Sequence, residues 1–304
     1  MLFKDVLNAK TTFIAPEFDK LFGLAMNNQY HPGDLLLVHV NGFFNQHIAA
    51  FNQNKVKKWN PHVIGSGREG HSENTHYQFI NKYRTRNIAK VTHAEYLKEV
   101  AWDPVKRELI DRLIELEADG IQIEMLIYLK FWEADLIIKK FYQLARLLNS
   151  EPYDWYFKIA ESKRSHNTTG TRQDIIRKGF FKKTESVLPK LIEQFRLAYN
   201  VQIRNAIAHS NYSFAGRVIS LLNFVKEDPY SQKSSLTFDE WIEIFHITIV
   251  LHNEYIRLNN RIGEYYKNIF DNGKKAVDVL ITEKEGQQYA LELEYKEESK
   301  TWVS

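Results

Sequence analysis

Cysteine is missing from the sequence, and its absence excludes two kinds of site. None of the 304 residues is a cysteine, so the chain forms neither a disulfide framework nor a zinc site built on thiolates. A chain without cysteine is typical of a reducing compartment. We therefore expect a cytoplasmic protein.

Long apolar runs and a strong excess of one charge are also missing. No stretch approaches the roughly 18 consecutive apolar residues that a membrane span needs, and the opening residues, MLFKDVLNAK, lack the pattern of a secretory signal. The net charge of +3 is too small to indicate a class of partner. These absences predict a soluble protein that does not engage a membrane.

The residues that are present predict a globular, mainly α protein. Hydrophobic residues make up 44% of the chain and charged residues 26%, the balance of a chain that buries a core. We expect three segments: a mixed α/β or irregular region over residues 1–102, a helical bundle over residues 103–270, and a β-hairpin over residues 271–304. The hairpin follows from the alternation of apolar and polar residues between Tyr289 and Tyr295.

Local signals set the expected helix ends within the bundle. Asp103 and Pro104 have the pattern of a helix start, and Gly120 is expected to end that helix. Pro189 is expected to open a long helix that continues toward His209.

A glycine-rich stretch, VIGSGREG, matches the G-x-G-x-x-G pattern of dinucleotide-binding loops through Gly65, Gly67 and Gly70. The residues after it do not read as the helix that such a site requires, and no βαβ unit with a ribose-binding acid follows. We therefore expect a flexible loop. No cofactor and no metal are expected, because the spacing of the nearby histidines matches no metal-binding pattern. These are His62, His71, His76 and His93.

The stretch RNAIAHS, from Arg204 to Ser210, ends a segment whose apolar residues recur at helical spacing. Asn205 and His209 are about one helical turn apart and share one side of the helix, and Arg204 is long enough to reach the same place. Three polar side chains therefore converge beside an apolar face. A structural interpretation is also open, because basic side chains at the C-terminal end of a helix interact favourably with its dipole.

The motif and the elements around it resemble those of the HEPN family of helical nucleotide-binding and ribonuclease domains. The order R-N-x-x-x-H, followed by a short hairpin in YSFAG and RVISLLNFV and by another long helix, carries the resemblance over about residues 121–270. It implies a HEPN-like helical bundle in which Arg204 and His209 are catalytic and Asn205 is their polar companion. It also implies an acid from an earlier helix, for which Glu133 and Asp135 are both candidates.

These residue types suit metal-independent cleavage of RNA. Histidine exchanges protons near neutral pH, and a guanidinium group holds two phosphate oxygen atoms at once. Attack by the 2′-hydroxyl leaves a 2′,3′-cyclic phosphate, so DNA is not a substrate. HEPN ribonucleases pair two motifs across a dimer and this chain has one, so the resemblance implies a homodimer with a composite active site.

A basic stretch is the expected contact for RNA. Between Ser162 and Lys183, seven lysines and arginines stand against the single acid Asp174, and such residues bind phosphates by displacing counterions. A solvated basic face without a partner explains the same pattern. The RNA-binding candidates are Lys163, Arg164, Arg172, Arg177 and Lys178.

The predicted function is a metal-independent endoribonuclease of HEPN type in a toxin or phage-defence setting. That setting implies an antitoxin or regulatory partner. Two other interpretations stay open. In the first, the chain is a catalytically silent HEPN-like module that binds either nucleotides or a partner protein. In the second, the chain is the regulatory or antitoxin partner of a separate enzyme.

Overall fold

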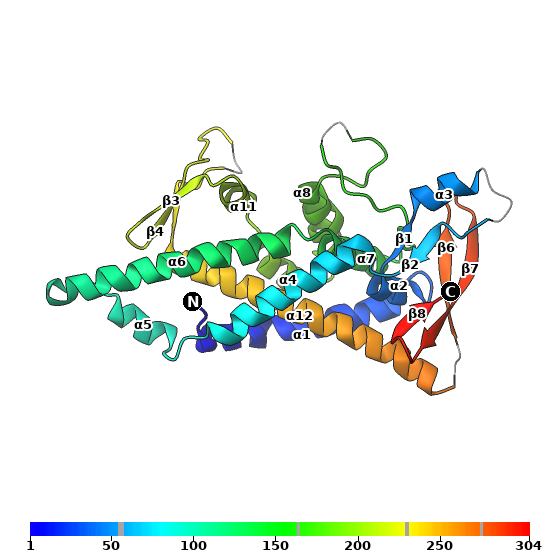
Figure 1. Cartoon of the computed structure of the whole chain (residues 1–304), viewed down its shortest axis with the longest axis horizontal. Coiled ribbons are helices and arrows are strands. Elements are labelled where there is room, and N and C mark those ends of the chain that lie inside the picture. Colours follow the sequence, from blue (N-terminus) through cyan, green and yellow to red (C-terminus); the bar gives the residue numbers. More distant parts are fainter. Residues whose placement is uncertain (54–57, 163–164, 229–230, 274–275) are drawn as a thin grey trace. The chain divides into compact units, whose positions relative to one another are not determined.

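Helix predominates in the computed structural model of the chain, which describes residues 1–53, 58–162, 165–228, 231–273 and 276–304 (Figure 1). The helices are α1 (Lys4–Asn28), α2 (Asp34–Val40), α3 (Gln46–Asn52), α4 (Gly67–Arg86), α5 (His93–Glu99), η1 (Pro104–Lys106), α6 (Arg107–Trp132), α7 (Asp135–Leu148), α8 (Arg172–Asp174), η2 (Ile175–Phe181), α9 (Lys182–Thr184), α10 (Pro189–Ala198), α11 (Val201–Ala208) and α12 (Phe238–Asp271). The strands are β1 (Gly42–Phe44), β2 (His62–Ile64), β3 (Tyr212–Ala215), β4 (Val218–Leu221), β5 (Ser235–Thr237), β6 (Ala276–Thr282), β7 (Gln288–Lys296) and β8 (Thr301–Val303). The expected mainly α class is confirmed.

The strands form small antiparallel sheets in the orders β1-β2, β3-β4-β5 and β6-β7-β8. In the second sheet Ala215 pairs with Val218, which leaves Gly216 and Arg217 as a two-residue turn. Gly216 has a φ of +55°, a left-handed conformation that glycine adopts without steric cost. At the C-terminal end, β6 and β7 form a hairpin to which β8 adds a third strand.

Two of the expected helix ends are wrong. Helix α6 continues through Gly120 to Trp132, because residues on both sides of the glycine are buried and a single glycine costs a helix only about 1 kcal/mol. The helix that begins at Pro189 ends at Ala198, and a new helix begins after Asn200. Asn200 has an extended backbone and its side chain accepts a hydrogen bond from the backbone of Ile203, so it caps the new helix.

The first hundred residues are more helical than expected, and the glycine-rich stretch itself contains the start of a helix. Helix α4 begins at Gly67, where a flexible loop was predicted from the sequence. This helix is mostly polar and buries few apolar residues, among them Ile80 and Tyr83, so its apolar periodicity is weak. The strand before it, β2, pairs antiparallel with β1 and therefore does not form the βαβ unit of a dinucleotide site.

Contacts divide the chain into two compact units that do not follow the order of the sequence. Unit 1 comprises Met1–Glu17, Glu73–Ala134 and Lys190–Glu254, and unit 2 comprises Phe18–Ser72, Asp135–Pro189 and Tyr255–Ser304. Each unit therefore takes residues from more than one of the three segments expected from the sequence. The Arg204 motif belongs to unit 1, and the basic stretch belongs to unit 2.

Aromatic side chains fill the core of unit 1. Trp241 of α12 lies 5.6 Å from Tyr128 of α6, measured between ring centroids, and stacks on Phe245 at 6.0 Å. Trp132 of α6 contacts Phe195 of α10 at 6.2 Å and Tyr199, the residue after α10, at 4.9 Å. These large buried rings hold α6, α10 and α12 together through apolar burial and ring contacts.

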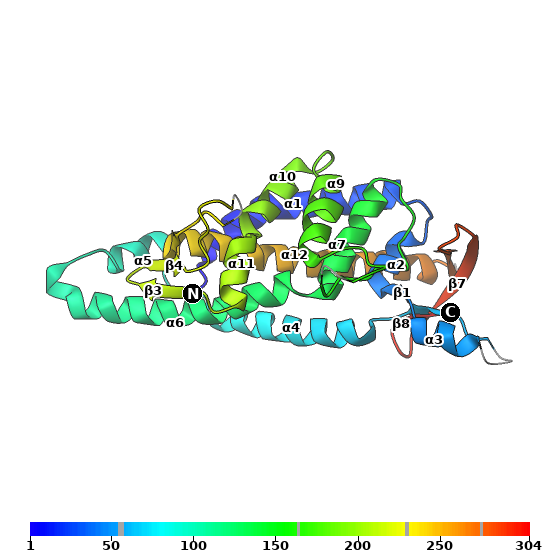
Figure 2. The same cartoon turned by 90° about the horizontal axis from the view of Figure 1, so that it is seen from above.

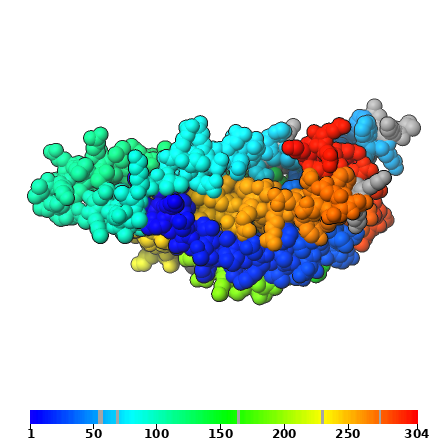
Figure 3. All heavy atoms as spheres, turned by 90° about the horizontal axis from the view of Figure 1, so that it is seen from below, coloured from blue at the N-terminus to red at the C-terminus, as the bar shows by residue number. Residues whose placement is uncertain are grey.

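Unit 2 has its own aromatic core around Phe141 of α7. Its ring lies 4.9 Å from Phe180 and 5.5 Å from Tyr255 of α12. On the surface, the parts of α1 and α12 in this unit lie side by side, in blue and orange in Figure 3. There, Asp19 forms ion pairs of 2.8 and 2.7 Å with Arg257 and Arg261.

Arg217, in the turn between β3 and β4, joins three elements of unit 1. Its guanidinium donates two hydrogen bonds, of 2.9 and 3.0 Å, to the buried carboxylate of Glu117 in α6. It also donates to both carboxylate oxygen atoms of Asp239 in α12, at 2.8 and 3.3 Å. Because a buried carboxylate requires a compensating charge, this contact fixes the hairpin against both helices.

Replacing Arg217 tests the importance of this contact. We expect Arg217→Ala to lower the free energy of unfolding by about 2 to 4 kcal/mol, because it leaves the Glu117 carboxylate buried without its guanidinium. Chemical denaturation measures the change. Arg107→Ala, which removes an exposed pair with Asp111, serves as the control and is expected to stay near the wild type. Equal small effects of the two substitutions would contradict the assigned role of Arg217.

A second stability test concerns Asp34, at the start of α2. Its side chain is buried, one carboxyl oxygen accepts a hydrogen bond from the backbone of His31, and burial raises its pKa to about 7. Below pH 4 both the folded and unfolded chains carry this proton, whereas between pH 4 and 7 only the folded chain keeps it. Stability is therefore lost as the pH rises through this range.

The side chain of the variant Asp34→Asn does not ionise, so this variant does not lose stability in this way as the pH rises from 4 to 7. Relative to the wild type, it is expected to gain roughly 2 to 4 kcal/mol between pH 4 and pH 8. Thermal unfolding across this range, with the exposed Asp111→Asn as control, measures the difference. A stability difference between Asp34→Asn and wild type that does not change with pH would refute the assignment.

Candidate active site

Three side chains position helix α11, which carries the Arg204 motif. Asn200 caps its first turn, and the hydroxyl of Tyr128 in α6 donates to the carbonyl of Ala198 at 3.0 Å while accepting from the backbone of Asn200 at 3.1 Å. The buried side chain of Gln202 exchanges two hydrogen bonds with the backbone of Lys233. Figure 2 shows α11 leading into β3, with α6 beside it. The helix is therefore tied to the rest of unit 1 at its start.

Arg204 lies in a polar group formed by two helices. Its Nε atom lies 2.8 Å from Oε1 of Glu133, the residue at the C-terminal end of α6, and forms an ion pair with it. Its Nη1 atom donates to Oδ1 of Asn205 at 2.9 Å. The structure thus brings Arg204, Asn205 and Glu133 together. Of the two acids considered from the sequence, Glu133 is the one beside the motif.

His209 is the last residue of the motif and caps the C-terminal end of α11. Its backbone donates to the carbonyl of Asn205 at 3.0 Å, and its side chain is exposed. Ser210 follows with a left-handed φ of 54°, and the backbone of Ser210 and Asn211 donates to the carbonyls of Ile207 and Ala206. This is the hydrogen-bond pattern of a Schellman motif.

The backbone thus satisfies the carbonyl groups at this end of α11. The structural interpretation of the motif required Arg204 and His209 to interact with the end of the helix. The guanidinium of Arg204 instead contacts Glu133 and Asn205. The imidazole of His209 lies at the surface, where a ligand can reach it.

The other sequence candidates lie in unit 2. Asp135 forms an ion pair of 2.7 Å with Arg172, and Lys178 forms one of 2.8 Å with Asp174. These acids reduce the positive charge that the two basic side chains offer to phosphates. Arg177 lies in η2, and Lys163 and Arg164 lie outside the described residues.

The described part of the chain shows no site for a metal and no membrane segment. No group of three or more histidine and carboxylate side chains in residues 1–53, 58–162, 165–228, 231–273 and 276–304 is arranged to hold a metal ion. Within the same ranges, no helix combines the length and apolar character of a membrane crossing.

Tyr128 positions the start of α11, and nothing in the sequence indicated this role. It is fully buried, and burial raises its pKa, so the hydroxyl remains protonated and keeps its hydrogen bond to Ala198. In the sequence it is one more aromatic residue on the apolar face of a helix. No local signal separates such a tyrosine from ordinary core residues.

The arrangement combines a fixed cation with an accessible imidazole. A guanidinium that a carboxylate and an amide hold in place is oriented for bidentate contact with an oxyanion. The imidazole of His209 is exposed near the end of the helix that carries Arg204. A guanidinium group is a phosphate ligand and an imidazole is a proton-transfer group in general.

Comparison of the chain with known proteins finds no match. No family profile, no curated protein and no solved structure matches the chain.

The site residues are expected to contribute little to stability. The Arg204 and Glu133 side chains are 19% and 33% exposed, whereas Glu117, the partner of Arg217, is only 3% exposed, so losing the Arg204 pair is expected to cost less than losing the Arg217 contact. Arg204→Ala, Glu133→Gln and His209→Ala should each unfold within a few degrees of the wild type in a thermal melt. A loss as large as that expected for Arg217→Ala would instead indicate a structural role for the motif.

Proposed function

We propose that this protein is a metal-independent endoribonuclease with a HEPN-like helical bundle. One observation carries the proposal: the guanidinium of Arg204 is held by Glu133 and Asn205, and an exposed His209 ends the same helix. The order of elements after the motif supports it further, since the β3-β4 hairpin and the long helix α12 follow directly. A toxin or phage-defence setting belongs to the same proposal.

The proposed reaction is attack of a ribose 2′-hydroxyl on the adjacent phosphorus. His209 accepts the hydroxyl proton as the bond between the 2′-oxygen and phosphorus forms. Arg204 contacts the non-bridging oxygen atoms, where negative charge increases in the transition state. The bond between phosphorus and the 5′-oxygen then breaks, and the 5′-oxygen takes up a proton. The products are a 2′,3′-cyclic phosphate and a 5′-hydroxyl.

Glu133 has a positioning role in this scheme. Its carboxylate pairs with the guanidinium by charge, with Oε1 2.8 Å from Nε but no aligned hydrogen bond between these two atoms. Asn205 accepts a hydrogen bond from Nη1. This arrangement orients the cation before the substrate binds, which lowers the reorganisation needed at the transition state.

A second copy of the chain completes the proposed site. One motif supplies one imidazole, whereas the reaction needs a proton acceptor at the 2′-oxygen and a proton donor at the 5′-oxygen. Two motifs brought together by a homodimer supply both groups and two guanidinium groups. The proposal therefore includes a composite cleft between two copies.

The test is cleavage of a mixture of tRNA and mRNA in excess EDTA. We expect the wild type to cleave and to leave 2′,3′-cyclic phosphate ends. His209→Ala is expected to cleave at least about 100-fold more slowly, because general acid–base catalysis contributes about that much or more. A loss of at least about 100-fold is also expected for Arg204→Ala, which removes an oxyanion-stabilising donor.

His71→Ala is the matched control, because His71 is also exposed but lies in unit 2, outside the basic stretch. It should cleave at the wild-type rate. Equal cleavage by the wild type and a folded His209→Ala variant would show that the assigned site is wrong. Nucleotide-dependent stabilisation without any cleavage would favour the binding module instead.

A further inference from the structure

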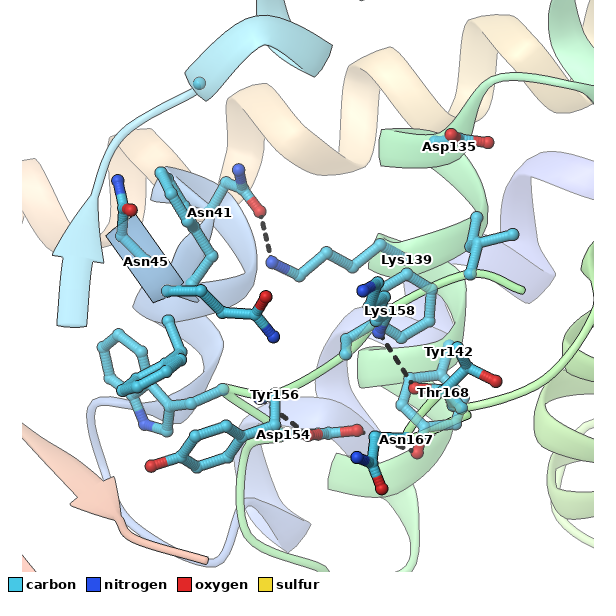
Figure 4. A pocket seen from close by; sticks show the side chains of 18 of the residues that line it. Asn41, Asn45, Asp135, Lys139, Tyr142, Asp154, Tyr156, Lys158, Asn167 and Thr168 are labelled. Carbon is cyan, nitrogen blue, oxygen red and sulfur yellow. Dashed lines mark hydrogen bonds between the residues drawn. The ribbon is translucent and has the colours of Figure 1, made fainter. Parts of the chain in front are cut away.

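Polar side chains that line a pocket of about 1280 Å³ in unit 2 contact one another (Figure 4). Lys139 donates to Oδ1 of Asn41 at 2.8 Å, and the carboxylate of Asp154 accepts from the hydroxyl of Tyr142 at 3.2 Å. These contacts lie within the wall of the pocket and indicate no particular class of ligand. The surface of unit 1 carries a more specific pattern.

A stripe of apolar side chains runs along the exposed side of α6 in unit 1. Leu109, Leu116, Ile123 and Leu126 are each between 44% and 58% exposed. Another side of the same helix carries the buried residues that pack into the core. A surface helix normally presents polar residues on the side away from the core. An apolar stripe there therefore indicates a contact surface.

The stripe has the spacing of a coiled-coil seam. Its successive positions, which we call the α6 seam, are Leu109, Arg112, Leu116, Asp119, Ile123 and Leu126, and all of them are exposed. The intervals alternate between three and four residues, which is the repeat that faces a partner helix in a coiled coil. Just before α6, Val105 and Trp102 add further apolar surface, at 91% and 71% exposure. In Figures 1 and 2 the start of α6 extends past the β3-β4 hairpin.

The two charged residues of the α6 seam, Arg112 and Asp119, determine which partner helix fits it. In a parallel pair of two copies, each seam residue faces the same residue of the other copy, so like charges meet at both positions. In an antiparallel pair that crosses near Leu116, Arg112 of each copy lies within about one turn of Asp119 of the other. Opposite charges favour such a contact and like charges oppose it.

We propose that the α6 seam binds the same seam of a second copy of this chain in antiparallel orientation. The pairing covers the exposed leucine and isoleucine side chains of both copies. It forms the contact between Arg112 and Asp119 twice, as a two-fold axis requires. The proposal does not depend on the ribonuclease function, because every residue that it uses lies outside the Arg204 motif.

This contact is distinct from the composite cleft of the proposed ribonuclease. Glu133 lies beside Arg204 and follows Leu116 by 133 − 116 = 17 residues, at the end of the same helix. Two copies that cross near Leu116 therefore hold their Glu133 residues roughly 50 Å apart, at 1.5 Å per residue. The two Arg204 motifs do not meet in this pair. A chain that uses both contacts assembles beyond a dimer.

Sedimentation velocity with the whole chain tests the proposal. We expect the wild type to self-associate across a concentration series. Leu116→Glu should weaken the association at least about 10-fold, because it places a carboxylate in an apolar contact. Leu197→Glu is the matched control, since Leu197 of α10 is 52% exposed but lies outside the α6 seam. It should associate like the wild type.

Exchange of the seam charges tests whether the partner is a second copy. Arg112→Asp leaves two acids in the seam and Asp119→Arg leaves two arginines, so like charges meet when either variant pairs with itself. Each variant alone should associate at least about 10-fold more weakly than the wild type. A mixture of the two variants should form a heterodimer, because an acid then faces an arginine at both contacts.

Spin labels report the orientation of the pair, since the chain has no cysteine and a single introduced cysteine takes one label. Glu115→Cys places the label near the crossing point, and Arg107→Cys places it near the start of α6. In an antiparallel pair, the distance between labels at position 107 should exceed the distance at position 115 by at least about 10 Å. A parallel pair gives similar distances at both positions.

Self-association that Leu116→Glu weakens and that the mixture of charge variants restores supports the proposal. A wild-type chain that is monomeric at every concentration overturns it and leaves a helix of another protein as the occupant of the seam. An oligomer that Leu116→Glu and both charge variants leave unchanged also overturns it, as do similar label distances at positions 107 and 115.

Discussion

The ion cluster of Arg217 is the constraint on which the arrangement of unit 1 depends. The carboxylate of Glu117 is buried on α6, and burial of a carboxylate is tolerated only beside a compensating cation. That cation stands in the turn between β3 and β4 and also contacts Asp239 at the start of α12. One guanidinium group thus fixes the position of the hairpin relative to two helices.

The position of the hairpin in turn affects the motif, because only His209, Ser210 and Asn211 separate α11 from β3. The left-handed conformation of Ser210 turns the chain out of the helix, and the backbone closes the helix end without using a side chain. His209 is consequently held at the surface at the junction of a fixed helix and a fixed hairpin. The polar group around Arg204 joins this helix to the end of α6 through Glu133.

In unit 2, the buried ammonium group of Lys139 donates hydrogen bonds to neutral acceptors. In unit 1 the buried charge is matched by a charge of opposite sign, whereas the hydrogen bonds from Lys139 to Asn41 and Gly42 hold a positive charge in place with neutral groups. The first arrangement stabilises a fold, since it joins elements through mutual neutralisation. The second orients the ammonium group of Lys139, which lines a pocket within unit 2.

Interactions between neighbouring residues account for what was predicted from the sequence: the mainly α class, the short hairpin after the motif and the long helix that follows it. These features depend on apolar periodicity, capping and turn chemistry, which act over a few residues. The continuation of α6 through Gly120 was not predictable, because tertiary burial overrides a weak local preference. Which of the 38 acids contacts Arg204, and which lysines line a pocket, depended on the tertiary structure. Such contacts join distant segments, and no spacing along the chain encodes them.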